Sequence, residues 1–249
     1  MNVVNFKLYM KMILIIFAVL IIFYILISVV RVFHKIGISR QLITKSQPYT
    51  QEGTKSAVIF IGDSTGVGTG SGTNKDSVAG RLGQDYPKVT IDNLSKNGAK
   101  VEDILPIIKN LPDKKYELIV IQIGGNNVIH FSNLNTVEAN LDESVKVSKE
   151  KADNVILITT GNVGLAPFFP WPINTIMSSR SKTLKDAAVD ISKKYGAYYV
   201  NLYQNKNNDP FAKDPKKYHA IDGLHPSSDG YGIWYQMLKD TLDSNSIKI

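Results

Sequence analysis

The feature that most constrains this chain is an uncharged run of 19 residues near its N-terminus, from Met12 to Val30. A helix rises about 1.5 Å per residue, so a helix over this run spans nearly the whole hydrocarbon core of a bilayer, which is roughly 30 Å thick. Arg31, His34 and Lys35 follow at once, where a membrane interface is expected. The run predicts a transmembrane anchor over residues 12–35, preceded by a short tail of residues 1–11.

A cleaved signal peptide is the alternative interpretation of this run. Its apolar region usually has about 7–15 residues and ends at a small-residue cleavage site. The run here is longer and closes on Val29, Val30 and Arg31, which favours an uncleaved anchor. Basic residues flank both ends, so the positive-inside rule does not decide the orientation. Because a single N-terminal span commonly translocates the domain after it, we expect a single-pass membrane protein with a periplasmic or cell-surface domain.

The rest of the chain divides into a linker and one domain. Residues 36–55 are predicted to be a linker, since the part from Gln41 to Lys55 is polar and contains Pro48 and Gly53. Residues 56–249 have a suitable length for one globular domain.

The net charge of +7 belongs mostly to the N-terminal segment. Residues 1–40 hold five basic side chains and no acidic ones, which leaves 24 basic and 22 acidic side chains in the remainder. A nucleic-acid-binding domain should carry a basic stripe on its folded surface, so this distribution argues against a nucleic-acid partner. The chain has no cysteine, which excludes disulfides, thiolate nucleophiles and cysteine metal sites.

Beyond the linker, short apolar runs alternate with helical patterns. The runs are rich in β-forming residues and cover 56–61, 117–123, 154–160 and 197–202, and residues 88–94 alternate like a strand. Helical spacing covers 76–86, 101–110, 136–151, 178–195 and 228–243. Five strands separated by helices predict βαβ units and one parallel sheet with helices on both faces. Ligands bind beyond the carboxyl ends of such strands, so we expect the chemistry there.

Polar or glycine-rich blocks follow four of the five predicted strands. They are Gly-Asp-Ser-Thr-Gly at 62–66, Asn-Gly-Ala at 97–99, Gly-Gly-Asn-Asn at 124–127, and Asp-Gly-Leu-His-Pro at 222–226. Together the blocks contain a serine, a histidine and an aspartate, which are the side chains needed for nucleophilic acyl transfer.

Acyl transfer assigns a role to each of these residues. A serine hydroxyl is a weak nucleophile until a base takes its proton, and His225 is the candidate base for Ser64. Asp222, three residues earlier on the same turn, is placed to hold the imidazole tautomer. A tetrahedral intermediate also needs donors for its oxyanion, for which we predict the backbone amides of Ser64 and Gly98 and the side-chain amide of Asn126.

The four blocks, in this order, resemble those of the SGNH hydrolases, also called the GDSL esterase family. The Ser, Gly, Asn and His that name the family match Ser64, Gly98, Asn126 and His225, and its Asp-x-x-His block matches Asp222 to His225. The resemblance covers about residues 56–240. It implies a flavodoxin-like αβα sandwich and hydrolysis of esters or related acyl groups, without a metal or organic cofactor.

One position departs from the family pattern. The third block of the family usually reads Gly-x-Asn-Asp, whereas this chain has Asn127 in place of the aspartate. The position is outside the four named residues, so we expect a change in the contacts that support the site more than a loss of activity.

Other interpretations of the same residues remain open. Ser64 also lies in a G-x-S-x-G match, which is typical of α/β-hydrolases, but in that fold an upstream strand and its oxyanion loop precede the serine. A non-catalytic binding module on the same fold and an acyltransferase using the same triad are the alternative functions. The ester substrate is expected to be either an O-acyl glycan of the envelope or an acyl ester of a membrane lipid.

The predicted loop of residues 161–179 is unusually apolar and contains three prolines. Loops are usually polar, so this one is a candidate acyl pocket, lid or membrane-contacting patch, unless its side chains simply pack onto the core. The candidate substrate-binding residues are Asp63, Asn127, Phe168, Phe169 and Trp171. The glycines at 66, 68, 70 and 72 match no phosphate-binding pattern and are expected to form a flexible loop beside Ser64.

Overall fold

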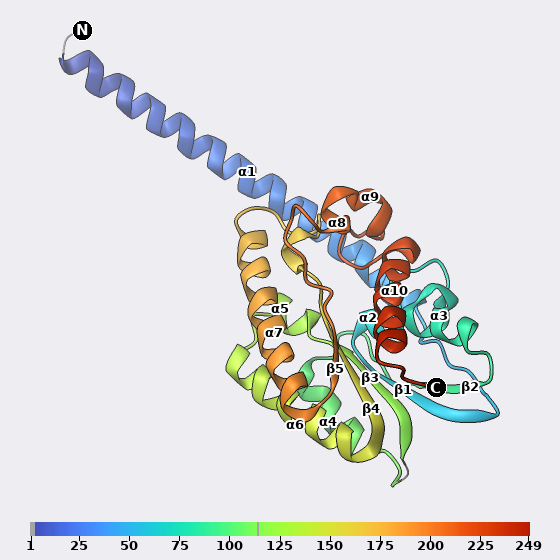
Figure 1. Cartoon of the computed structure of the whole chain (residues 1–249). Coiled ribbons are helices and arrows are strands. Elements are labelled where there is room, and N and C mark those ends of the chain that lie inside the picture. The colour runs from blue at the N-terminus through green and yellow to red at the C-terminus, as the bar shows by residue number, and fades with distance from the viewer. Residues whose placement is uncertain (1–2, 114) are drawn as a thin grey trace.

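Five parallel strands form one sheet in the computed structural model, which describes residues 3–113 and 115–249. The strands are β1 (Lys55–Gly62), β2 (Val89–Asn93), β3 (Tyr116–Ile123), β4 (Ala152–Thr159) and β5 (Tyr198–Val200). Their spatial order is β2-β1-β3-β4-β5, and every pairing is parallel (Figure 1). This is the flavodoxin-like order, and it confirms the predicted fold class.

Helices cover both faces of the sheet. One face carries α4 (Val101–Lys109), α6 (Leu134–Lys151) and α7 (Ile173–Tyr195), and the other carries α3 (Val78–Asp85) and α10 (Ser228–Ser244). Successive side chains of a strand point to opposite faces. In β1, Ile59 and Ile61 therefore join the first apolar cluster, while Val58 and Phe60 join the second. Burial on both faces explains why the central strands β3 and β4 are nearly continuous apolar runs, whereas the edge strand β2 alternates.

In the described residues, six further helices have only three to five residues each and were not predicted, because so short a segment shows no periodicity. They are α2 (Ser64–Val67), η1 (Asn74–Asp76), α5 (Gly125–Ile129), η2 (Val163–Leu165), α8 (Pro210–Lys213) and α9 (Pro215–Tyr218). The predicted loop of 161–179 is also partly helical, since it contains η2 and the first turns of α7.

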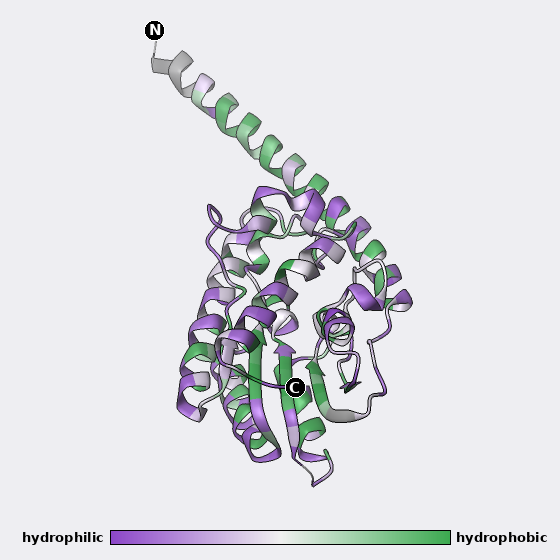
Figure 2. Cartoon of the chain, turned by 45° about the vertical axis from the view of Figure 1, so that its right-hand side comes forward, coloured by the Kyte–Doolittle hydropathy of each residue, from purple (hydrophilic) through white to green (hydrophobic). Residues whose placement is uncertain are grey.

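The N-terminal helix α1 (Val3–Lys45) has 43 residues and extends well beyond the domain (Figure 1). Its outer part is almost uniformly apolar (Figure 2), and the large apolar side chains from Met12 to Val30 are 42–69% exposed. This part is long and apolar enough to cross a membrane, a property that an N-terminal signal sequence can share.

The predicted linker of residues 36–55 is wrong, because this segment is ordered against the domain. Residues 36–45 continue α1. Further on, Gln51 exchanges two backbone hydrogen bonds with Ile91 of β2, at 2.8 and 3.0 Å, and Tyr49 packs on the second apolar cluster. Polar composition does not distinguish a free linker from a segment whose backbone pairs with a sheet edge.

Candidate active site

The site lies at the carboxyl ends of β1 and β3, where the strand order reverses and where open α/β sheets bind their ligands. Ser64 is the first residue of α2, directly after β1, and Asp63 caps that helix by accepting a hydrogen bond from the Thr65 amide at 2.9 Å. Gly62 packs against the Gln122 carbonyl of β3 so closely that a side chain has no space. This close packing sets the turn that presents Ser64.

A turn before α10 brings His225 and Asp222 to Ser64. The His225 Nε2 lies 3.0 Å from Ser64 Oγ, and His225 Nδ1 lies 2.6 Å from Asp222 Oδ2. Asp222 Oδ1 also accepts the backbone amides of Leu224 and His225, at 2.9 and 3.1 Å. The structure therefore brings together the predicted nucleophile, base and orienting carboxylate in the order that acyl transfer requires.

Asp222 is fully buried but remains ionised. Burial alone raises the pKa of this carboxyl, yet the hydrogen bond and charge of His225 and the donors from Leu224 and Ser39 outweigh it and hold the pKa at about 2. The carboxylate is therefore charged at any working pH and fixes Nδ1 of His225 as the protonated nitrogen.

The predicted oxyanion donors line one cavity with Ser64 and His225. The amide of Ser64 is in the first turn of α2, where backbone N–H groups have no intrahelical acceptor. Gly98 has φ of +80° and open space where a side chain would be. Asn126 donates one N–H to the Ala99 carbonyl at 2.9 Å, which leaves its second N–H for a ligand.

The cavity has a volume of about 270 Å³ and a mixed lining. Val163, Phe168, Leu202 and Trp234 supply an apolar wall from the domain. A second part of the wall comes from α1, through Ile36, Ser39, Arg40 and Ile43. In the part of the chain that the structure describes, no group of three acidic or histidine side chains is placed to hold a metal ion.

Sequence comparison decides the family. The GDSL-like lipase/acylhydrolase family matches residues 60–233, which is well over half of the chain. The chain belongs to this family. It is therefore a carboxylic ester hydrolase, as the four motif blocks predict. No curated protein matches the sequence significantly.

Solved structures share the fold of this GDSL-like chain. A lipase/acylhydrolase from Enterococcus faecalis is 21% identical with a TM-score of 0.56, and the match covers 77% of this chain and 97% of that one. A lipolytic G-D-S-L protein from Veillonella parvula (14%, TM-score 0.60) matches over 75% and 98% of the two chains. An acetylxylan esterase from Geobacillus stearothermophilus (20%, TM-score 0.55) matches over 77% and 96%.

Ser39 is the residue at this GDSL-like site that the sequence did not reveal. Its hydroxyl donates a hydrogen bond to Asp222 Oδ2 at 2.7 Å, and its side chain is buried. The signal that the sequence offers is helical spacing, since Lys35, Ser39 and Leu42 are three or four residues apart. In the structure these three residues lie on the less exposed side of α1. That spacing continues the anchor helix into the predicted linker.

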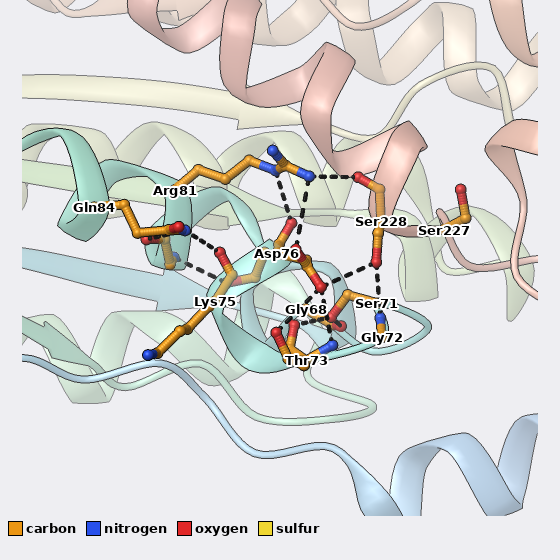
Figure 3. A network of polar contacts seen from close by, with 12 residues as sticks. Gly68, Ser71, Gly72, Thr73, Lys75, Asp76, Arg81, Gln84, Ser227 and Ser228 are labelled. Carbon is orange, nitrogen blue, oxygen red and sulfur yellow. Dashed lines mark hydrogen bonds and ion pairs between the residues drawn. The ribbon is translucent and has the colours of Figure 1, made fainter.

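The glycine run after Ser64 is closely packed, so the prediction of a flexible loop is wrong. Gly70 has φ of +98°, and a Cβ there would lie 2.6 Å from the Pro226 carbonyl and 2.9 Å from His225 Cβ. A polar network joins this loop to α10 (Figure 3). In it, Ser228 Oγ accepts the Gly72 amide at 2.9 Å, and Arg81 donates to the Ser228 carbonyl at 2.9 Å. The glycines allow the nucleophile's loop to lie directly on the histidine turn.

Two of the predicted substrate-binding residues have structural partners. Asn127 is fully buried, accepts the Val101 amide at 3.0 Å and donates to Glu102 at 2.9 Å, so it fixes the start of α4 and cannot contact substrate. Asp63 lines the cavity, but its two oxygens accept hydrogen bonds from Thr65 and Gly125. Burial raises the pKa of Asp63, while these hydrogen bonds oppose the increase.

The aromatic candidates divide between two cavities. Phe168 lines the catalytic cavity and also a second, apolar groove beside α1, whereas Phe169 and Trp171 line the groove alone. Trp171 is 68% exposed. His219 also lines the catalytic cavity, and its burial lowers its pKa to about 4 and keeps the ring neutral.

Proposed function

We propose that this protein is a membrane-anchored serine ester hydrolase with Ser64 as nucleophile, His225 as general base and acid, and Asp222 as the orienting carboxylate. The observation that carries the proposal is the continuous contact from Ser64 Oγ through the imidazole to Asp222, at 3.0 and 2.6 Å. All three side chains are buried, and Ser64 and His225 line a cavity that Gly98 and Asn126 also line.

In this proposal His225 Nε2 takes the proton of Ser64 as Oγ attacks the ester carbonyl. The developing oxyanion accepts hydrogen bonds from the amides of Ser64, Gly98 and Asn126. The imidazolium then protonates the leaving alcohol, and an acyl-serine remains. A water molecule, deprotonated by the same nitrogen, attacks this ester, and the proton returns to Ser64 Oγ as the acid departs.

The membrane part of the proposal is supported by contacts between α1 and the aromatic segment, residues 167–173. Arg31 and Lys35 each donate to the Pro167 carbonyl at 2.8 Å. Tyr24 donates to the Trp171 carbonyl at 2.9 Å. Tyr24 is seven residues before Arg31, or about 10 Å deeper along a membrane-spanning helix. If α1 is inserted, Trp171 therefore enters the apolar region while Pro167 remains near the head groups.

Of the two substrate classes, the acyl ester of a membrane lipid fits better than an O-acyl glycan. The groove between α1 and the aromatic segment has a volume of about 770 Å³, and its lining is almost wholly apolar. Ile129 and Phe168 line both this groove and the catalytic cavity, so the two are adjacent. A fatty acyl chain can occupy the groove while its ester lies at Ser64. The structural neighbours include both a lipase/acylhydrolase and an acetylxylan esterase, so they do not favour either class.

The test is an acyl-chain-length profile on the full chain in detergent micelles. Ser64→Ala should abolish turnover of every p-nitrophenyl ester, and the parent should prefer octanoyl over acetyl. Ser64-independent turnover would contradict the catalytic assignment. A preference for acetyl with full dependence on Ser64 would keep the triad and exclude the lipid substrate.

A further inference from the structure

The hydroxyl of Ser39 lies inside the active site, although Ser39 belongs to α1 and is outside the family match of residues 60–233. It reaches Asp222 across 183 positions of sequence. We propose that Ser39 is a positioning residue of the catalytic triad, through which α1 forms part of the active site. This proposal rests on the proposed function, because it requires Asp222 to orient His225.

The need for Ser39 follows from the hydrogen bonds around the Asp222 carboxylate. Oδ1 accepts two backbone amides of its own turn, from Leu224 and His225. Oδ2, the oxygen that holds His225 Nδ1, has Ser39 as its other donor, at 2.7 Å. A fully buried carboxylate is costly unless its oxygens are hydrogen-bonded. The Ser39 hydroxyl is therefore the group from α1 that holds Oδ2 in place, while His225 contacts the same oxygen from the catalytic turn.

Contacts on the preceding turns hold Ser39 in register. Arg31 and Lys35 are eight and four residues before Ser39, on the same side of the helix. Both donate to the Pro167 carbonyl at 2.8 Å. Phe168, which follows Pro167 in the chain, donates its amide to the carbonyl of Gly223 in the catalytic turn, at 2.9 Å. The helix and the Asp222–His225 turn are thus joined at two places, and Ser39 is the contact that reaches the triad itself.

Ser39 also affects the charge on Oδ2. Its hydroxyl draws negative charge away from the oxygen that faces the imidazole. Without this donor Oδ2 becomes a stronger acceptor for the imidazole and stabilises its protonated form. At the same time the carboxylate is less well ordered, so the base is less often aligned with Ser64. The two effects predict a lower kcat and an acidic limb of the rate profile that moves to higher pH.

The experiment compares Ser39→Ala and Ser39→Thr with the parent, all as full chains in micelles, using a p-nitrophenyl ester and active sites counted with a fluorophosphonate. Ser39→Ala should lower kcat about tenfold with little change in KM. It should also shift the acidic limb upward by a few tenths of a pH unit. Ser39→Thr retains the hydroxyl and should restore most of the kcat and the parental pH profile.

Thr44→Ala is the matched control. Thr44 is on the same helix, is exposed, and donates only to the Arg40 carbonyl one turn before it, so its loss should change neither kcat nor the pH profile. If Ser39→Ala equals Thr44→Ala per active site, with an unmoved acidic limb, Ser39 only packs and the proposal is overturned. If the parent itself has no Ser64-dependent turnover, the proposed function fails together with this proposal.

Discussion

The two halves of α1 differ sharply in how they meet the rest of the molecule. From Met12 to Val30 the large side chains are exposed and apolar, and Tyr24 makes the polar contact to the domain. From Arg31 to Lys45 the same helix donates hydrogen bonds to Pro167 and Asp222 and lines the catalytic cavity. One continuous helix therefore has one half suited to lipid and one half that packs into an enzyme site.

Under the proposed function, anchoring and catalysis depend on separate residues of one helix. Each can then be removed while the other is kept. This separation can be tested first at the Asp222–His225 turn, which both the domain and α1 contact.

Asp222→Asn gives the largest expected effect. The amide keeps the shape of the carboxylate but not its charge, so the imidazole loses its preferred tautomer and kcat/KM should fall about 10³- to 10⁴-fold. When Ser39→Ala is added to Asp222→Asn, the rate should change less than about twofold further, because the carboxylate oxygen that accepts the Ser39 hydroxyl is already lost. A full tenfold further loss in the double variant would show that α1 acts on the rate by another route.

Two truncations separate the halves of α1. Removing residues 1–30 should leave turnover of a soluble short-chain ester within about threefold of the full chain, since the docked half remains. Removing residues 1–45 deletes Ser39 and part of the cavity wall, and kcat/KM should fall about a further 10²-fold. Equal rates for the two truncated proteins, normalised to labelled active sites, would contradict a catalytic contribution from residues 31–45.

Phe168→Ala tests the junction between the catalytic cavity and the groove. Loss of this ring removes about 1–2 kcal/mol of apolar contact with a long acyl chain, so kcat/KM for an octanoyl ester should fall about tenfold. An acetyl ester does not reach the groove, and its turnover should change less than about threefold. A uniform decrease for both esters would indicate damage to the site instead of a chain-binding role.

The smallest effect is expected from His219, beside the α1 wall of the cavity. Its pKa in the folded state is about 4, below the ordinary value of 6.5, so the fold prefers the neutral ring. The stability that this neutral ring contributes is complete above pH 6.5 and is lost as the pH falls towards 4, by about 2–3 kcal/mol.

His219→Gln should therefore reduce the difference in melting temperature between pH 7 and pH 4.5 by a few degrees. Activity at pH 7 serves as the control that the cavity is intact. An unchanged difference in melting temperature would show that another group causes the acid sensitivity.

Much of this arrangement could be predicted from the sequence, because the strands are apolar runs and the motif blocks follow them. The positions of Ser64, Gly98 and Asn126 at one edge of the sheet follow from the topology of parallel strands. The Asp222–His225 turn is separated from β5 by α8 and α9, and only its motif placed it at the same edge. In contrast, Asn127 looked available to substrate because its contact with Glu102 forms only when α4 packs beside α5.

The role of α1 could not be predicted for a related reason. Local sequence shows that residues 36–55 are polar, but not that a helical face there meets a turn nearly 200 residues later. The glycines near Ser64 posed the same problem, since Gly70 makes its close contacts with His225 and Pro226, which are distant in sequence. Contacts between segments distant in sequence were the information that was missing.

The uninterrupted course of α1 also limits where the enzyme can work. A flexible tether lets a catalytic domain sweep through a large volume around its anchor. Here the helix continues from the apolar run to the triad, and Arg31 and Ser39 are only eight residues, or about 12 Å, apart along it. If α1 spans a bilayer, Ser64 is held at a nearly constant height above the head groups. Such an enzyme would have a short working distance, and esters borne on polymers far from the membrane would be beyond its reach.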